Sequence, residues 1–235
     1  MRRLFTRLRP GGAVALALGA LLAVFIGVGV GLGRLMENNS GVIERDRRVL
    51  DWFIRRRQPG ITTVARYVTA LGASQVLLVI VVGVGVISWQ RTQSWRTLLT
   101  LAASLGGARA LFTIVKVVIG RPRPTSAFSL GRYSGYAFPS GHASQAAAVY
   151  FTLAVLVSMG TNRRITKAGA WTVAAFTVTA VGCTRLYLGA HWLTDVLAGW
   201  ALGTLWCATV LAVIRAVQNV HRSVVPAASE QASAT

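Results

Sequence analysis

The sequence predicts an all-α integral membrane protein, a single bundle of six transmembrane helices spanning residues 1–235. Hydrophobic residues make up 54% of the chain and charged residues only 13%, about half the charged share usual in soluble domains. The mean hydropathy is +0.55. Long uncharged stretches recur along the chain. Each is long enough to cross a hydrocarbon layer of about 30 Å at about 1.5 Å per residue.

Six apolar stretches give the expected spans. Four arginines precede the first stretch. It is longer than the apolar part of a signal peptide, so we interpret it as a retained anchor. In chain order the expected spans are 11–33, 67–90, 97–118, 140–159, 168–187 and 191–214. The polar tail, residues 223–235, is expected to have no regular structure.

The distribution of positive charge predicts which side of the membrane each loop occupies. Six spans put both termini on one side, together with the short connectors 90–96 and 161–167, which carry five Lys and Arg residues. This pattern is typical of cytoplasmic loops. The segment 34–66 then lies outside, although it carries eight arginines, offset in part by four acids. Within it, residues 49–54 are expected to form an amphipathic helix on the membrane surface.

The chain carries 25 Lys and Arg against 6 Asp and Glu, a net charge of +19. In a soluble protein such a balance would suggest nucleic acid as a partner. Here the charges lie between apolar runs, so anionic lipid headgroups are the expected partner and nucleic acid is not.

Glycines four residues apart, at 27 and 31, 29 and 33, and 199 and 203, predict close helix packing. A homodimer formed through one of these faces is the alternative interpretation.

Three ionisable residues near the starts of predicted spans form the first candidate site. His191 and Asp195 are four residues apart, so they share one helix face. A carboxylate there fixes the tautomer of the imidazole and leaves its other nitrogen free to act as nucleophile or base. The alternative is that Asp195 only caps the helix N-terminus. His142 begins the fourth span.

The segment around His142 indicates an anion site. Pro139 is suited to an early helical position, Ser140 to capping, and Gly141 to close approach of a ligand to the backbone. The free N–H groups of such a helix start bind anions. An ordinary capped helix with an incidental histidine remains the alternative.

Three further cations flank the predicted spans. Lys116 and Arg123 bracket the end of the third span, and Arg185 ends the fifth. Guanidinium and ammonium groups grip phosphate well, although such residues also snorkel at helix ends. Arg121 is either another interfacial charge or part of the site. In the six-span topology all these side chains lie at one membrane face, which predicts a site for a phosphate ester.

The same residues match three motifs in order, over about 80 residues. KxxxxxxRP occurs at 116–124, PSGH at 139–142, and SRxxxxxHxxxD at 184–195, with Thr184 in place of the usual serine. The chain therefore resembles the type 2 phosphatidic acid phosphatase family, whose core is a six-helix membrane bundle. The hydroxyl of Thr184 is expected to preserve the phosphate contact of serine.

The resemblance implies a phosphohydrolase that needs no metal and no cofactor. His191 would attack phosphorus and form a phosphohistidine, Asp195 would orient His191, and His142 would protonate the leaving oxygen. The phosphoryl oxygens would be held by Lys116, Arg123, Arg185, Ser140 and the N–H of Gly141. Arg109, two turns before Lys116, is expected either to support the site from behind, as Thr184 would, or to pair with backbone carbonyls.

The predicted function is hydrolysis of a phosphate from a membrane lipid at the extracytoplasmic face. A prenyl diphosphate, such as the carrier lipid of bacterial wall synthesis, is the leading substrate, followed by phosphatidic acid and phosphatidylglycerol phosphate. A carrier of lipid phosphates without catalysis is one alternative, because buried charges also mark transport paths. A phosphotransferase that uses the same phosphoenzyme is the other.

Overall fold

The computed structural model describes residues 39–232 and single residues between 19 and 34. The expected first span, 11–33, therefore lies mostly outside the described residues. All regular structure in the described part is helical, which confirms the all-α class. The helices are α2 (Ser40–Ile54), α3 (Pro59–Ala70), α4 (Ser74–Thr92), α5 (Arg96–Ile119), α6 (Gly141–Met159), α7 (Arg164–Tyr187) and α8 (Leu193–Ala232), with a short 3₁₀ helix, η1 (Ser126–Phe128).

Four of the described helices are long and apolar enough to cross a membrane. They are α4, α5, α6 and the part of α8 from Leu193 to Val217. The structure thus supports a multi-pass membrane protein, but among the described residues it does not reach the expected six spans. Helix α7 has 24 residues, the same length as α5, but Arg164, Lys167 and several threonines make it less apolar.

The expected second span is two helices. Helix α3 ends at Ala70 and α4 begins at Ser74. A Cβ atom at Gly72, in the turn between them, would lie 3.1 Å from the carbonyl oxygen of His142. Because glycine has no Cβ atom, this turn can pack closely against the start of α6. Leu71 and Ala73, which flank Gly72, are apolar, so hydropathy alone does not reveal the break.

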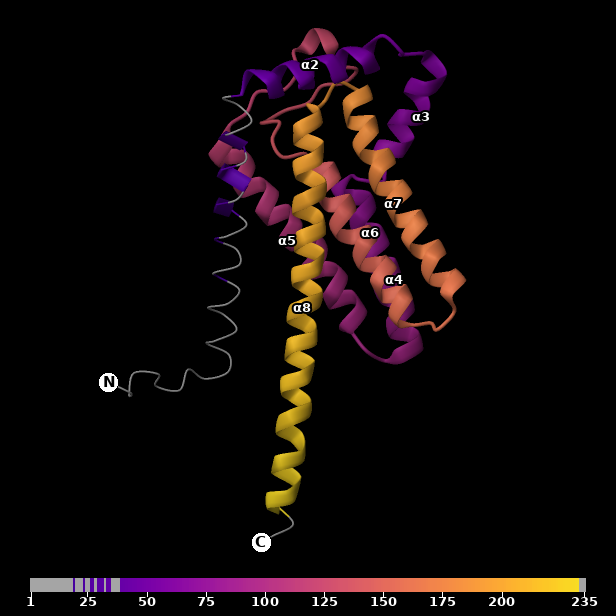
Figure 1. Cartoon of the computed structure of the whole chain (residues 1–235). Helices are drawn as coiled ribbons and strands as arrows, with labels where there is room; N and C mark the ends of the chain where they lie inside the picture. The colour runs from indigo at the N-terminus through magenta and orange to yellow at the C-terminus, as the bar shows by residue number, and fades with distance from the viewer. Residues whose placement is uncertain are drawn as a thin grey trace, which may run out of the picture.

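Helix α8 continues to Ala232, beyond the position where the sequence predicts an irregular tail. Alanine, glutamine and glutamate have high helix propensity and extend the helix through the polar segment. In Figure 1 this extension projects from the bundle at the end opposite α2.

Helix α2 lies across one end of the bundle and α3 descends from it (Figure 1). It covers Ser40–Ile54, longer than the amphipathic stretch 49–54 expected from the sequence. Asp46 and Leu50 form its buried face, whereas Trp52 is exposed. After α2, the Arg57 side chain donates hydrogen bonds to the carbonyls of Tyr187 and Phe128, at 2.9 and 2.7 Å. These bonds fasten the α2–α3 connection to α7 and to the long loop that precedes α6.

Helix α6 lies at the centre and contacts α5, α7 and α8. Its face toward α8 is built from small residues such as Ala143 and Ala147, which meet Gly199 and Gly203 of α8. These two glycines therefore make a contact within the chain, which corrects the alternative of a dimer face for this pair. The close approach brings the starts of both helices together, and the N–H of Ser140 donates to the carbonyl of Asp195 at 2.9 Å.

Candidate active site

A cavity of about 310 Å³ opens where α5 ends and α6 begins. Five of the predicted site side chains line it, which brings together regions up to 75 residues apart in sequence. The lining residues are Ser74, Phe112, Lys116, Arg123, Arg132, Tyr133, Ser134, Gly141, His142, Gln145, Arg185 and His191.

His191 lies in the connection between α7 and α8 and is 2% exposed. Its Nδ1 is 3.4 Å from Oδ2 of Asp195, and its Nε2 is 3.2 Å from Nη1 of Arg123. With the proton on Nδ1, the lone pair of Nε2 faces the guanidinium. Burial lowers the pKa of His191 well below its usual value, and the nearby cations Arg185, Arg123 and Lys116 lower it further. The imidazole is therefore neutral and able to act as a nucleophile.

Asp195 stands behind His191 rather than in the cavity wall, and it is fully buried. Its Oδ2 also accepts the N–H of Trp192 at 2.9 Å, and its Oδ1 accepts from Nη1 of Arg121 at 2.6 Å. Asp195 thus does both things that the sequence left open: it caps the start of α8 and contacts the imidazole.

Lys116 braces the loop that leads into α6. Its ammonium donates to the carbonyls of Tyr136, Ala137 and Pro139, at 2.6, 3.2 and 3.0 Å. All three N–H donors are thereby engaged. Lys116 therefore holds the loop before α6 in place and contributes its charge to the cavity.

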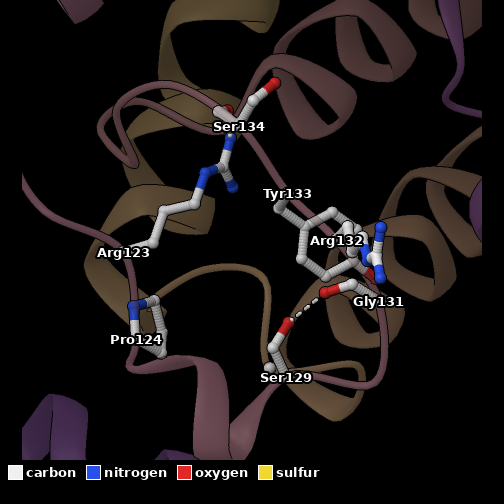
Figure 2. Close-up of a pocket in the computed structure, with 8 residues that line it drawn as sticks. Arg123, Pro124, Ser129, Gly131, Arg132, Tyr133 and Ser134 are labelled. Carbon is white, nitrogen blue, oxygen red and sulfur yellow. Dashed lines mark hydrogen bonds between the residues drawn. The ribbon is translucent and has the colours of Figure 1, made fainter.

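Arg123 is held by the same loop. Its Nε donates to the carbonyl of Gly135 at 3.0 Å, and its Nη1 to that of Ala190 at 2.7 Å. Figure 2 shows the side chain extending toward Ser134, whose carbonyl accepts from Nη2 at 3.1 Å. A second cavity of about 550 Å³ adjoins the first. It shares Arg123, Arg132, Tyr133 and Ser134 with the first and is also lined by Pro124, Ser129, Gly131 and Gly189.

Two buried polar atoms at the site have no hydrogen-bond partner among the described residues. They are Oγ of Ser140 and Nε of Arg185. The Arg185 guanidinium otherwise donates to Oγ1 of Thr69 at 3.0 Å and lies 4.8 Å from the ring centroid of Tyr133. Buried polar groups are rarely left unpaired. With the N-terminus of α6 beside them, these atoms are suited to the oxygens of a bound phosphate.

Thr184 does not line the cavity. Its hydroxyl donates to the carbonyl of Val181 at 2.6 Å, within α7. In this structure the hydroxyl proton is thus engaged by the helix backbone. The phosphate contact expected for Thr184 stays a prediction.

Arg109 is exposed on α5, not turned to the bundle interior as expected for a charge in a membrane helix. Its Nη1 donates to Oγ of Ser74 at 2.8 Å, and that hydroxyl donates to Oε1 of Gln145 at 2.9 Å. The Gln145 amide donates to the carbonyl of Gly141 at 3.2 Å. Ser74 and Gln145 both line the cavity, so this chain of bonds connects Arg109 to the start of α6.

Replacing Arg109 by leucine is expected to lower kcat about threefold to tenfold, because one hydrogen bond worth about 1 kcal/mol no longer orients Ser74 and Gln145. Phosphate release by the purified variant measures this. Arg164→Leu, at an exposed position at the start of α7, is the control and should match wild type. Equal activity and stability of Arg109→Leu and wild type would contradict the supporting role.

Several residues at the site were missed by the sequence analysis. Asp46 is the most notable, because it is buried and forms an ion pair with Arg121, which in turn pairs with Asp195. Arg121, whose role the sequence left open, belongs to the site through these two pairs. The signal for Asp46 was its position four residues before the apolar Leu50, which puts both on one helix face. Arg132, Tyr133 and Ser134 lie in a loop where no periodic pattern marks a role.

Comparison with known proteins gives an independent view of the chain. The family model of the PAP2 superfamily matches residues 97–219, which include all three motifs. Phosphatidylglycerophosphatase B of Bacillus subtilis is 38% identical over 171 residues, covering 72% of this chain and 82% of that protein. Lipid A 1-phosphatase of Rhizobium etli is 33% identical over 117 residues, 45% of each chain.

Two solved structures are similar in fold. The crystal structure of a transmembrane PAP2-type phosphatidylglycerolphosphate phosphatase from Bacillus subtilis has a TM-score of 0.74 and 30% identity. The match covers 84% of this chain and 96% of that one. LpxE of Aquifex aeolicus has a TM-score of 0.56 at 21% identity, over 70% of this chain and 93% of that one. The second likeness concerns the fold alone.

Proposed function

This chain is a lipid phosphatase of the PAP2 superfamily, and from that premise we propose that it removes a terminal phosphate from a membrane lipid through a phosphohistidine on His191. Membership confirms the resemblance carried by the three motifs. The observation that best supports the proposed chemistry is the pair of unpartnered buried atoms, Ser140 Oγ and Arg185 Nε. Arg185 lines the cavity, and Ser140 directly precedes Gly141, which also lines it, so both donors lie near the space that a phosphoryl group would occupy.

In the first half of the proposed reaction, Nε2 of His191 attacks phosphorus and the bond from phosphorus to the lipid oxygen breaks. The proton on Nδ1 stays with the imidazole, and the carboxylate of Asp195 stabilises the positive charge that develops on the ring. His142, which lines the same cavity, donates its proton to the leaving oxygen.

In the second half, His142 accepts a proton from water, and the resulting hydroxide oxygen attacks phosphorus. The bond between phosphorus and Nε2 breaks, which releases inorganic phosphate and neutral His191. Phosphoryl transfer needs mainly positioning and charge stabilisation. The cations of Lys116, Arg123 and Arg185 provide that charge.

For the substrate we propose phosphatidylglycerol phosphate first, because the relative with 38% identity is named for that activity. The prenyl diphosphate and phosphatidic acid expected from the sequence remain predictions to be tested beside it. All three carry a terminal phosphate on a lipid whose apolar part stays in the bilayer. Such a phosphate can reach a cavity that opens at the membrane surface.

We also propose that the site faces the extracytoplasmic side and that both termini are cytoplasmic. The positive connectors support this orientation. Arg91 and Arg96 flank the turn between α4 and α5, and Arg163, Arg164 and Lys167 lie in the α6–α7 connection and the first turn of α7. Both connections are at the end of the bundle opposite α2 (Figure 1).

Purified protein in detergent is expected to release inorganic phosphate from at least one of these lipids in excess EDTA. The described residues contain no cluster of three or more His, Cys, Asp and Glu side chains that would hold a metal ion, and the fixed cations take its place. Phosphate release, measured with and without EDTA on each lipid, tests this. Loss of activity in EDTA would contradict the account of charge stabilisation, and binding of a lipid phosphate without release would favour the carrier alternative.

A further inference from the structure

Arg121 lies between two buried carboxylates. Its Nη1 donates to Oδ1 of Asp195 at 2.6 Å, and its Nη2 donates to Oδ2 of Asp46 at 2.7 Å. The three side chains are 7% exposed or less. Asp46 comes from α2, which lies before the region matched by the family model. Through Arg121, two buried contacts across 75 and 74 residues of sequence join α2 to the carboxylate behind the nucleophile.

Asp46 also caps the helix that carries Asp195. Its Oδ1 accepts the N–H of Thr194 at 2.9 Å, and its Oδ2 accepts the hydroxyl of Thr194 at 2.6 Å. The same hydroxyl accepts from Nη1 of Arg121 at 2.7 Å. Thr194 is the second residue of α8 and precedes Asp195. Asp46 therefore occupies the position of a capping carboxylate, supplied by a different helix.

The charges of this group bear on His191. An ion pair of Arg121 with Asp195 alone would be neutral, and the guanidinium would weaken Asp195 as a partner for a positive imidazole. The carboxylate of Asp46 on the same guanidinium gives the group a net charge of −1. In a buried site that charge is poorly screened. It stabilises the positive charge that develops on His191 as Nε2 bonds to phosphorus.

We propose that Asp46 is a positioning residue for the nucleophile, which acts through Arg121 and Thr194 to orient Asp195 and to keep a negative charge behind His191. This inference rests on the proposed phosphatase function. It extends the active site to α2, a helix across one end of the bundle (Figure 1) that none of the three motifs includes.

The first test is Asp46→Asn, which keeps the shape and one acceptor but removes the charge. We expect kcat to fall on the order of tenfold to a hundredfold, as for other partners behind a catalytic histidine, with KM changed less than about twofold. Asp51→Asn, the same chemical change on the same helix, is the matched control and should leave both constants unchanged. Asp46→Asn with the kcat of Asp51→Asn would overturn the proposal.

A second variant distinguishes the electrostatic role of Asp46 from a purely structural role. Asp46→Asn combined with Arg121→Met leaves Asp195 as the single charge, so the group returns to −1. We expect this double variant to have a higher kcat than Asp46→Asn alone, although it lacks more of the native bonds. A purely structural role predicts a lower kcat for the double variant than for Asp46→Asn, because each further lost contact would lower kcat again. A lower kcat in the double variant would therefore overturn the electrostatic role.

Failure of this inference is distinguishable from failure of the proposed function. If wild type releases phosphate from a lipid and Asp46→Asn does so equally well, the function stands and the inference fails. If wild type and Asp51→Asn both release no phosphate from any of the three proposed lipids, the proposed function is wrong, and the inference, which rests on it, is wrong as well.

Discussion

Replacing His191 by alanine is expected to lower kcat by about 10⁴-fold or more, the largest effect of any single substitution considered for this chain. The reason is that Nε2 is the atom that bonds to phosphorus, and Arg123 and Asp195, the groups on either side of the ring, cannot substitute for it. Phosphate release from the preferred lipid measures the loss. A variant that lacks the nucleophile should also fail to retain labelled phosphate after an acid-free quench.

His221→Ala is the matched control for this substitution, because His221 lies outside the three motifs. It should keep wild-type activity. Added imidazole is expected to restore part of the activity of His191→Ala by occupying the space of the missing ring. If His191→Ala retained more than about a tenth of the wild-type rate, another group would have to be the nucleophile, and the phosphohistidine mechanism would be wrong.

Replacing Gly203 by alanine is expected to destabilise the fold by about 3 kcal/mol and to lower the apparent melting temperature in detergent by about 5–10 °C. A Cβ atom at this position would collide with the carbonyl oxygen of Ser144 and would lie 2.8 Å from Cβ of Ala147. Helices α6 and α8 would have to separate. Activity should fall as well, since the Ser140 N–H would be drawn away from Asp195.

Gly83→Ala on α4 is the control, because a Cβ atom there meets nothing within 4 Å. Alanine is a better helix former than glycine, so this variant should be as stable as wild type or slightly more stable. Melting curves of both variants, followed by fluorescence in the same detergent, make the comparison. Equal melting temperatures would show that the α6–α8 contact tolerates an extra methyl group.

The sequence predicted α5 best: the span expected at 97–118 is the helix Arg96–Ile119. Helix α7 ends at Tyr187 as expected but begins at Arg164, four residues before the expected start at 168. The prediction failed at the break between α3 and α4, where the flanking residues are apolar and only packing of Gly72 against α6 determines the turn. The sequence also underestimated the length of α2. The amphipathic helix was expected to begin at Val49, but Asp46 already belongs to its buried face.

For the site, the cavity residues that belong to the three motifs were predictable, because their types and spacing carry the chemistry; the other cavity residues, such as Arg132 and Tyr133, were not. The partners behind them were not. Asp46 contacts Arg121 across 75 residues and Thr194 across 148. No local pattern encodes such a contact, and an acid within an arginine-rich segment is most simply explained as a surface charge. Thr184 shows the converse: its type matches the motif, yet its hydroxyl bonds to its own helix.

The backbone bond from the Ser140 N–H to the carbonyl of Asp195 has a consequence for how the protein adapts to membranes of different thickness. Helices respond to a thinner or thicker bilayer by changing their tilt. Because α6 and α8 are joined at the end that carries the site, such tilting pivots there. The opposite ends, at Met159 and Val217, undergo the displacement. We therefore expect the separation of His191 from the start of α6 to be insensitive to the acyl-chain length of the surrounding lipid.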